Sequence, residues 1–309
     1  MVIPIVLSLL AAIFYAATNH IDKYLISKVV KKADYRALIL VSSIIAGGIM
    51  TLIYLFICNF QLSFDIPSIL LLLFNSILYT VANIFWFKAL NRDNTTIIVI
   101  MLQLIPVFTL LLSPLILQNQ HISVLQLIGG LLITLAAIIL PYEPTHKKFN
   151  PKKLLTLAIM TFVSLAYAAW SIIERYVNQD HDFNQTILWS NITLLLVGLF
   201  IFVFIKSYRK SFSKLFQTNK TKVISLNLIN EILNSFGDVF STLAGTLASV
   251  ALVSFITQGI QPFMVMLMGL FITKLFPKIE KEKTTRTDII KRTTTITMCL
   301  IGLALIEFG

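Results

Sequence analysis

The chain has 309 residues, of which 57% are hydrophobic and only 13% are charged, and its mean hydropathy is +0.86. Soluble domains contain about 45–50% apolar and about 25% charged residues, so a soluble fold of this length would leave much apolar surface in water. The same numbers exclude a disordered chain, and the presence of only 11 Gly and 9 Pro excludes a collagen-like one. The class that fits is a protein with several membrane-spanning helices.

Ten apolar segments follow one another along the chain, each close to the length of about 20 residues that a membrane-spanning helix needs. They cover residues 3–22, 37–58, 68–90, 96–117, 123–141, 154–176, 186–206, 223–243, 250–273 and 289–308. The connectors are polar and too short to hold a soluble domain, and the one at 206–222 is expected to be a solvated basic loop. We therefore predict an all-α integral membrane protein with ten transmembrane helices.

The two halves of the chain repeat one another. The matched residues are Tyr15 with Tyr167, Asp22 with Glu174, Lys23 with Arg175, Asn75 with Asn230, Tyr79 with Asn234, Asn83 with Asp238, and Pro106 with Pro262. We expect one five-helix repeat at 1–141, a basic cytoplasmic connector at 142–153, and a second five-helix repeat at 154–309. Because five is odd, the second repeat is inverted, an arrangement typical of secondary transporters whose substrate site lies near the midplane.

The basic residues favour the count of ten. If the odd-numbered connectors share one side of the membrane, 24 of the 25 Lys and Arg residues lie on that side, and only Arg175 lies on the other. Lys and Arg are retained on the cytoplasmic side, so we expect the odd-numbered connectors in the cytoplasm and both termini outside. The net charge of +11 is then a signal of topology, and no nucleic-acid partner is expected.

Several motifs give the chain a likeness to a known family. They are the Ala89-Leu90 end of the third segment, the run Leu104-Ile105-Pro106-Val107-Phe108, and Gln126-Leu127-Ile128-Gly129-Gly130 in the fifth segment. With its two five-helix repeats, nearly the whole chain resembles the EamA-like branch of the drug/metabolite transporter superfamily. The resemblance implies transport of a solute by alternating access, through a central cavity lined mainly by the third, fourth, eighth and ninth helices.

A stripe of polar side chains runs along the eighth segment. Asn227, Asn230, Glu231, Asn234 and Asp238 fall within about 100° of the helix circumference, at about 100° per residue. A carboxylate at the centre of a spanning helix costs about 2.5–3.5 kcal/mol on insertion scales. We therefore expect the stripe to face the bundle interior or a wet cavity, where it binds the substrate.

The third segment is expected to form the opposite wall of the site, because Asn75, Tyr79, Asn83 and Trp86 share one face. Amides and hydroxyls at mid-depth replace the hydration shell of a solute, and the two aromatic rings stack on an apolar or cationic group. The alternative is a polar seam in which amide side chains bond across packed helices. The acids of the eighth segment favour a cavity, since no Lys or Arg lies mid-span to neutralise them.

An acid with no basic partner in a low-dielectric medium is either protonated at rest or holds a cation. Glu231, together with Asp238, is therefore expected to couple transport to protons or to bind a cation. The alternative is an acid that stays permanently neutral and serves only as a hydrogen-bond donor.

Pro106 and Pro262 lie mid-span in the fourth and ninth segments, where each removes a helical hydrogen bond and frees a carbonyl one turn earlier. Gln103, Gln258 and Gln261 lie within a turn of these prolines. Freed carbonyls and amides of this kind coordinate substrate in some carriers, and the kinks can act as hinges. The alternative is a fixed kink that serves packing.

Asp22-Lys23 and Glu174-Arg175 end the first and sixth segments, and inversion places the two pairs at opposite faces of the membrane. They are either gate latches that break alternately or ion pairs that anchor helix ends.

These features predict a secondary transporter for a small polar metabolite, such as an amino acid, an amine or another cationic or zwitterionic solute, in the inner or plasma membrane. The alternatives are an integral-membrane enzyme, a channel and a scaffold. No motif for a nucleophile with its base, a metal site or a phosphate-binding loop is present, and Cys58 and Cys299 form no framework. We therefore expect no cofactor and no metal. The expected partners are the solute and membrane lipid, with the chain a monomer or a homodimer.

Overall fold

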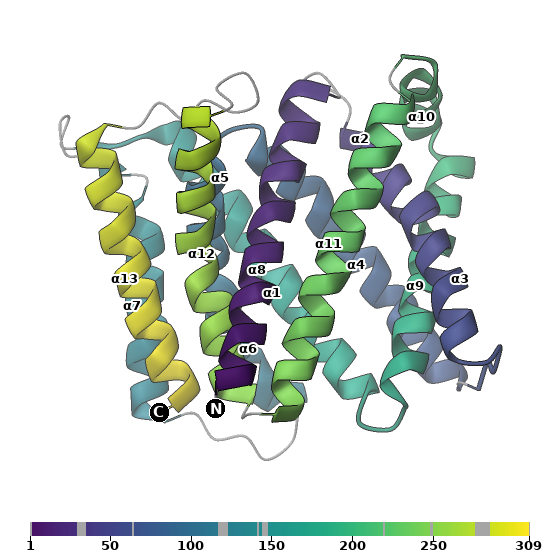
Figure 1. Cartoon of the computed structure of the whole chain (residues 1–309), viewed down its shortest axis with the longest axis horizontal. Coiled ribbons are helices and arrows are strands. Elements are labelled where there is room, and N and C mark those ends of the chain that lie inside the picture. The colour runs from purple at the N-terminus through teal and green to yellow at the C-terminus, as the bar shows by residue number, and fades with distance from the viewer. Residues whose placement is uncertain are drawn as a thin grey trace.

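The computed structural model describes residues 2–29, 35–63, 65–116, 123–140, 142–143, 148–218, 220–247, 250–275 and 285–308. They form a bundle of long helices that run roughly side by side (Figure 1). The first half contains α1 (Val2–Tyr24), the π-helical turn η1 (Leu25–Val29), α2 (Tyr35–Leu40), the π-helical turn η2 (Val41–Ala46), α3 (Gly47–Ile57), α4 (Ile66–Leu90), α5 (Thr95–Leu102), α6 (Leu104–Ile116) and α7 (Val124–Ile139). The second half contains α8 (Pro151–Val177), α9 (Phe183–Phe204), α10 (Lys206–Thr218), α11 (Lys220–Leu247), α12 (Val250–Leu275) and α13 (Arg286–Phe308). Between the halves, the short strands β1 (Tyr142–Glu143) and β2 (Lys148–Phe149) pair antiparallel.

Each of the ten predicted segments coincides with helix. Among the described residues, eight helical stretches are long and apolar enough to cross a membrane. These are Val2–Val29, Tyr35–Ile57, Ile66–Leu90, Thr95–Ile116, Pro151–Val177, Phe183–Phe204, Ile256–Leu275 and Arg286–Phe308. Of the other two segments, α7 is apolar but only 16 residues long, and α11 has 28 residues but carries the polar stripe. The helical membrane class is confirmed, while the count of ten spans stays a prediction.

The predicted basic loop at 206–222 is wrong, because its first part folds as α10. Three apolar side chains of this helix, at intervals of four and three residues, are buried or half-buried: Tyr208, Phe212 and Leu215. Lys206, Arg209, Lys210 and Lys214 are exposed on its other side. This amphipathic spacing lets α10 pack on α2 and α9, which a count of polar residues does not reveal.

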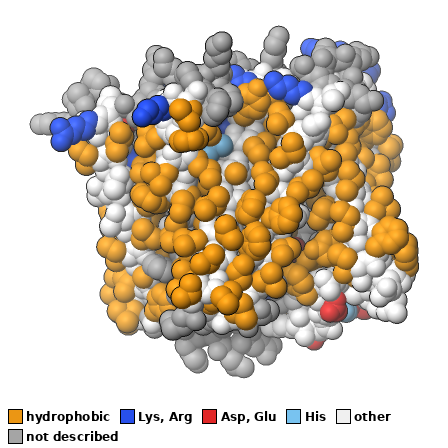
Figure 2. Space-filling view, in the orientation of Figure 1, with side chains coloured by type: hydrophobic (Ala, Val, Ile, Leu, Met, Phe, Trp, Pro, Cys, Tyr) orange, Lys and Arg blue, Asp and Glu red, His pale blue; other side chains and the backbone are white. Residues whose placement is uncertain are grey.

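The surface divides into an apolar band and a basic end. Exposed large apolar side chains occur along the spanning helices, and Figure 2 shows them covering the middle of the molecule, with Lys and Arg gathered along its upper edge. The two chain ends lie together at the opposite edge (Figure 1). An apolar belt of this kind is the surface that acyl chains cover.

Each of the main helix contacts has a counterpart between the helices that the sequence matches in the other half. α1 packs on α11 and α12, while α8, the corresponding helix of the second half, packs on α4, α5 and α6. α3 packs on α9 and α7 packs on α13. In each of these two pairs, the partners are the matched helices of the two halves. The equivalence seen in the sequence therefore extends to the contacts.

Two glycines allow α7 and α13 to approach closely. A Cβ added at Gly129 would clash with the carbonyl oxygen of Gly302, and one added at Gly302 would lie 2.6 Å from the carbonyl oxygen of Gly129. Close approach of helices at small residues is the usual way in which membrane helices gain packing energy. Gln126 adds a hydrogen bond across the same interface, from its Nε2 to the carbonyl of Ile306 at 3.1 Å.

Replacing Gly129 with Ala should therefore lower the melting temperature of the purified protein, because an added methyl forces the two backbones apart at a cost of about 1–3 kcal/mol. Gly130 provides a matched control, since a Cβ there would meet only Val107 Cγ1 at 3.6 Å. Gly130→Ala should leave the melting temperature unchanged or raise it. Equal losses for both variants in detergent would contradict the proposed close contact.

Candidate functional site

The polar stripe of α11 points into the bundle. The exposed apolar side chains of this helix fall within about 80° of its circumference, and they are Ile229, Ile232, Phe236, Val239, Leu243 and Leu247. The centre of the Asn227–Asp238 stripe lies roughly 170° away from the centre of that apolar face. Glu231 and Asp238 therefore lie on the side of α11 opposite its exposed apolar face.

Asp238 is an exposed side chain on this inward face. Tyr15 of α1 donates from Oη to Asp238 Oδ1 at 2.8 Å, and Asn234 donates from Nδ2 to Oδ2 at 3.4 Å. Gly237 permits the Tyr15 contact, because a Cβ there would lie 2.7 Å from Tyr15 Cε1. Asp238 thus contacts α1 on the side of α11 opposite its exposed apolar face. Glu231 is half-buried on the same face.

The residues of the first half that the sequence matches to Tyr15 and Asp238 make a similar hydrogen bond. Tyr167 and Asn83 are the counterparts of Tyr15 and Asp238, and Tyr167 Oη donates to Asn83 Oδ1 at 3.3 Å. Asn83 Nδ2 in turn donates to the carbonyl oxygen of Tyr79 at 3.0 Å. The two halves therefore share one tyrosine contact, in which the acceptor is an acid in one half and an amide in the other.

An aromatic cluster joins α4 to α8. The ring centroid of Tyr79 lies 5.5 Å from that of Trp170 and 6.0 Å from that of Tyr167. The faces of these rings carry partial negative charge, which attracts cations.

Asp22 accepts hydrogen bonds from two other helices. Trp86 Nε1 of α4 donates to Oδ2 at 3.1 Å, and Asn230 Nδ2 of α11 donates to Oδ1 at 2.9 Å. Trp86 and Asn230 are only 4% and 8% exposed. A predicted wall residue and a predicted stripe residue thus meet at an acid that the sequence suggested only as a latch.

The two predicted ion-pair latches have other contacts instead. Lys23 Nζ donates to carbonyl oxygens at the C-terminal end of α4. Glu174 Oε1 accepts from Ser190 Oγ at 3.4 Å, and Arg175 is exposed. At the first of these helix ends a charged side chain donates to main-chain oxygens, and at the second an acid accepts from a neutral hydroxyl.

Two predicted binding residues lie in packed seams. Asn227 is 1% exposed, and its Nδ2 donates to Ser42 Oγ of η2 at 3.0 Å. Asn75 is 2% exposed and donates from Nδ2 to the carbonyl oxygen of Trp170 at 3.3 Å. Their contacts are those of the alternative interpretation, a polar seam between helices.

The two mid-span prolines differ in their effect. The fourth segment is interrupted at Gln103, three residues before Pro106, and so divides into α5 and α6. α12 runs through Pro262 as one helix, and the carbonyl that this proline frees is that of Gln258, four residues earlier. Gln103 Nε2 donates to that oxygen at 3.2 Å. Gln261, beside Pro262, is half-buried.

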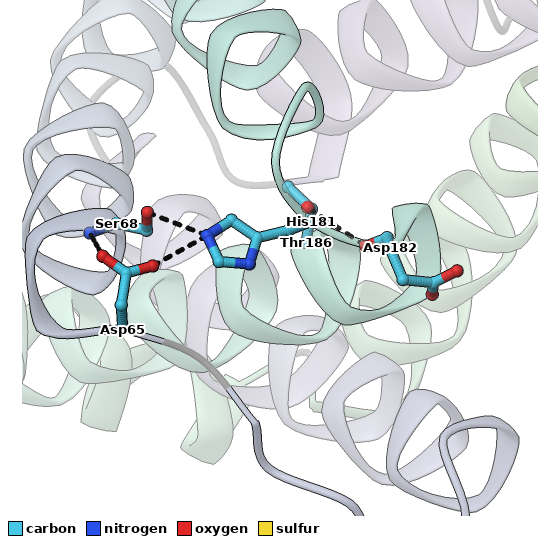
Figure 3. Close-up of polar contacts among 5 residues, drawn as sticks. All are labelled: Asp65, Ser68, His181, Asp182 and Thr186. Atoms are coloured by element: carbon cyan, nitrogen blue, oxygen red, sulfur yellow. Dashed lines mark hydrogen bonds and ion pairs between the residues drawn. The ribbon is translucent and has the colours of Figure 1, made fainter.

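A separate polar cluster joins the start of α4 to the turn before α9 (Figure 3). His181 Nε2 lies 2.7 Å from Asp65 Oδ1 and 3.0 Å from Ser68 Oγ. Because both contacts use the same ring nitrogen, this is not the arrangement of a nucleophile with its base, which uses both nitrogens. Hydrogen bonds from the Ser68 amide and then from its hydroxyl lower the pKa of Asp65 below its usual 3.8.

The sequence-based prediction of the site omitted Tyr15, Tyr167, Ser42 and Trp170. Tyr15 and Tyr167 were detectable, since they mark the repeat and lie seven residues before the matched acids Asp22 and Glu174. Nothing in the sequence singles out Ser42 or Trp170, whose roles depend on which helix they face. Within the described ranges, no group of three His, Cys, Asp or Glu side chains is arranged to hold a metal ion.

Comparison with known proteins finds a match in the first part of the chain. Residues 2–142 match the model of the EamA-like transporter family, which is a branch of the drug/metabolite transporter superfamily. The resemblance drawn from the sequence is confirmed over these residues. Members of this family are transporters rather than enzymes.

The solved structures show the same fold. Among 21 matching chains is one titled only "Crystal structure of protein", at 10% sequence identity and a TM-score of 0.52. The match covers 96% of this chain and 95% of the other. No curated protein matches the chain.

Replacing Gln103 with Leu should lower the melting temperature of the purified protein, because the carbonyl of Gln258 loses its donor. A buried polar group left without a partner costs about 1–3 kcal/mol. Pro262→Ala supplies a main-chain N–H for the same carbonyl, so the Gln103→Leu loss should be smaller in that background. A double-mutant cycle measures this coupling, and equal losses in both backgrounds would contradict the contact.

Replacing Asp65 with Ala should destabilise the protein at neutral pH by removing the cap of α4 and the His181 contact. The pKa of Asp65 is lower in the folded protein than its unfolded value of about 3.9. Its stabilising contribution is therefore present above that pH and is lost as the pH falls through the folded value. The difference in melting temperature between wild type and variant should shrink below about pH 4, and a difference that grows on acidification would oppose this assignment.

Proposed function

We propose that the protein is a secondary transporter that moves a small cationic or zwitterionic solute by alternating access between its halves, residues 1–141 and 154–309. The observation that carries the proposal is the exposed Asp238 on the face of α11 opposite the lipid-covered one. A seam between helices has no need of an exposed carboxylate, whereas a solute pathway does.

Ten membrane crossings in two inverted repeats are supported by the exchange-related helix contacts. They are also supported by the chain ends, which lie at one edge of the molecule and so require an even number of crossings (Figure 1). We propose that the edge rich in Lys and Arg faces the cytoplasm and that both termini lie outside, in the inner or plasma membrane.

The class of solute follows from charge and aromatic content. Glu231 and Asp238 lie on the inward stripe of α11, and no Lys or Arg lies mid-span beside them. The Tyr79–Trp170 cluster adds ring faces that attract an ammonium group. Amino acids, choline-like amines and polyamines fit this environment, whereas a phosphate would need a bidentate basic partner.

Proton coupling is proposed to run through Glu231, with Asp238 as the second acid. In the membrane interior, an acid without a basic partner changes its proton occupancy when water or a solute cation reaches it. The released or captured proton then links solute movement to the proton gradient.

Replacing Glu231 with Gln should leave the fold intact but remove the pH dependence of transport, because the amide cannot exchange a proton. A thermal-shift screen against amino acids, choline and spermidine at two pH values first identifies a binding solute. Uptake of that solute into liposomes, with and without a pH gradient, then measures the coupling.

Asp180→Asn serves as the control, since Asp180 is an exposed acid in the turn after α8, and it should retain gradient-driven uptake. Unchanged proton dependence in Glu231→Gln would overturn the coupling role. In the same liposomes, counterflow separates a carrier from a channel, and mass spectrometry of the recovered solute separates it from an enzyme.

A further inference from the structure

The matched acids Asp22 and Glu174 lie in unequal surroundings. Asp22 accepts from Trp86 and Asn230 at 3.1 and 2.9 Å, which ties α1 to α4 and α11 near the Lys- and Arg-rich end. Glu174 has a single long contact, 3.4 Å from Ser190 Oγ. The counterpart of the Asp22–Trp86 bond would join α8 to α11. Within the part of the chain that the structure describes, no hydrogen bond joins these two helices.

The partners that the repeat assigns to Glu174 are present nearby. Asn75 is the counterpart of the asparagine that binds Asp22. Its Nδ2 donates to the carbonyl oxygen of Trp170, one helical turn before Glu174, and its Oδ1 is buried with no hydrogen-bond partner. Ser241 of α11 occupies the position that corresponds to Trp86. A donor on α4 and a donor on α11 thus stand at the two positions from which Asp22 is bound in the other half.

We propose that Asp22 and Glu174 are the acceptors of two gates that close alternately, and this rests on the proposed alternating access. In the state described, Asp22 closes the basic end. In the opposite state, Asp22 releases Trp86 and Asn230, and Glu174 accepts from Asn75 Nδ2 and Ser241 Oγ to close the other end. Inverted repeats reach their second state when each half takes the shape of the other, so the contacts of one acid specify those of its counterpart.

The two gates are unequal in strength. Trp86 brings a large buried ring and an indole donor to Asp22, whereas Ser241 offers a small hydroxyl to Glu174. The Asp22 gate therefore forms more contacts when closed, and the state closed at the basic end is the resting one.

Spin labels report both gates without any solute. Lys28 and Arg92 flank the Asp22 gate, and their counterparts Asp180 and Leu247 flank the Glu174 gate; all four side chains are exposed. The labels are placed in a Cys58→Ser, Cys299→Ala background, and distances are measured by double electron–electron resonance in nanodiscs.

Asp22→Ala should shift the Lys28–Arg92 distances to longer values and the Asp180–Leu247 distances to shorter ones. Adding Glu174→Ala should leave the first pair long and abolish the shortening of the second pair. Asp182→Ala, which removes an acid that caps α9 at the same end, is the matched control and should leave the shortening intact.

Equal shortening in Asp22→Ala with and without Glu174→Ala would overturn the proposal, as would an Asp22→Ala protein in which neither pair moves. Should Asp22→Ala fail to fold, Trp86→Phe removes only the indole donor and should lengthen the Lys28–Arg92 distances by a smaller amount. Distances that respond as expected in a protein that transports no solute would support the gates while refuting the carrier. Solute counterflow with distances insensitive to Glu174 would refute only the gates.

Discussion

The structure depends on one constraint, which is that a carboxylate in a spanning helix must avoid the acyl chains. This constraint fixes the rotation of α11, whose apolar exposed face and acidic face lie on opposite sides of the helix. It also determines the neighbours, because an inward acid needs hydrogen-bond donors that its own helix supplies only in part. Tyr15 meets Asp238, and Trp86 with Asn230 meets Asp22. The packing of α1 on α11 follows from these needs as well as from apolar contact.

The class of protein and the direction of the polar stripe were predictable because both depend on local patterns. Hydropathy over about 20 residues marks a spanning helix, and spacing at 3.6 residues per turn marks a face. The partner of each polar group was not predictable in this way. Tyr15 and Asp238 are 223 residues apart, and their meeting depends on how far two packed helices are rotated and shifted relative to each other.

Two further features show where local patterns are insufficient. α10 was predicted as a loop because its basic residues dominate the composition, although Tyr208, Phe212 and Leu215 give it a buried face and it packs on α2 and α9. For the carbonyl freed by Pro262, coordination of substrate and a fixed kink were left as alternatives, and in the structure Gln103 from the other half donates to it. The repeat in the sequence indicates some of these contacts where composition does not. Tyr15 and Tyr167 occupy matched positions, and their hydroxyls donate to the matched residues Asp238 and Asn83.

The two halves make similar contacts but differ in the charge of the residue that accepts the tyrosine hydrogen bond. This difference affects how the proposed gates are linked to the ionisable site. The tyrosine acceptor is an acid only in the second repeat, at Asp238, while its counterpart Asn83 is neutral. Tyr15 and Asp22 lie seven residues apart on nearly the same face of α1, about 10 Å along the helix. A shift of α1 that breaks the Asp22 gate therefore also moves the hydroxyl that holds Asp238. On the proposed mechanism, the gate and the ionisable site are linked by one rigid helix, a physical connection of the kind that coupling between distant groups requires. The matching helix α8 carries Tyr167 and Glu174 at the same spacing but faces an amide, so proton occupancy acts on one gate directly and on the other only through the exchange of states.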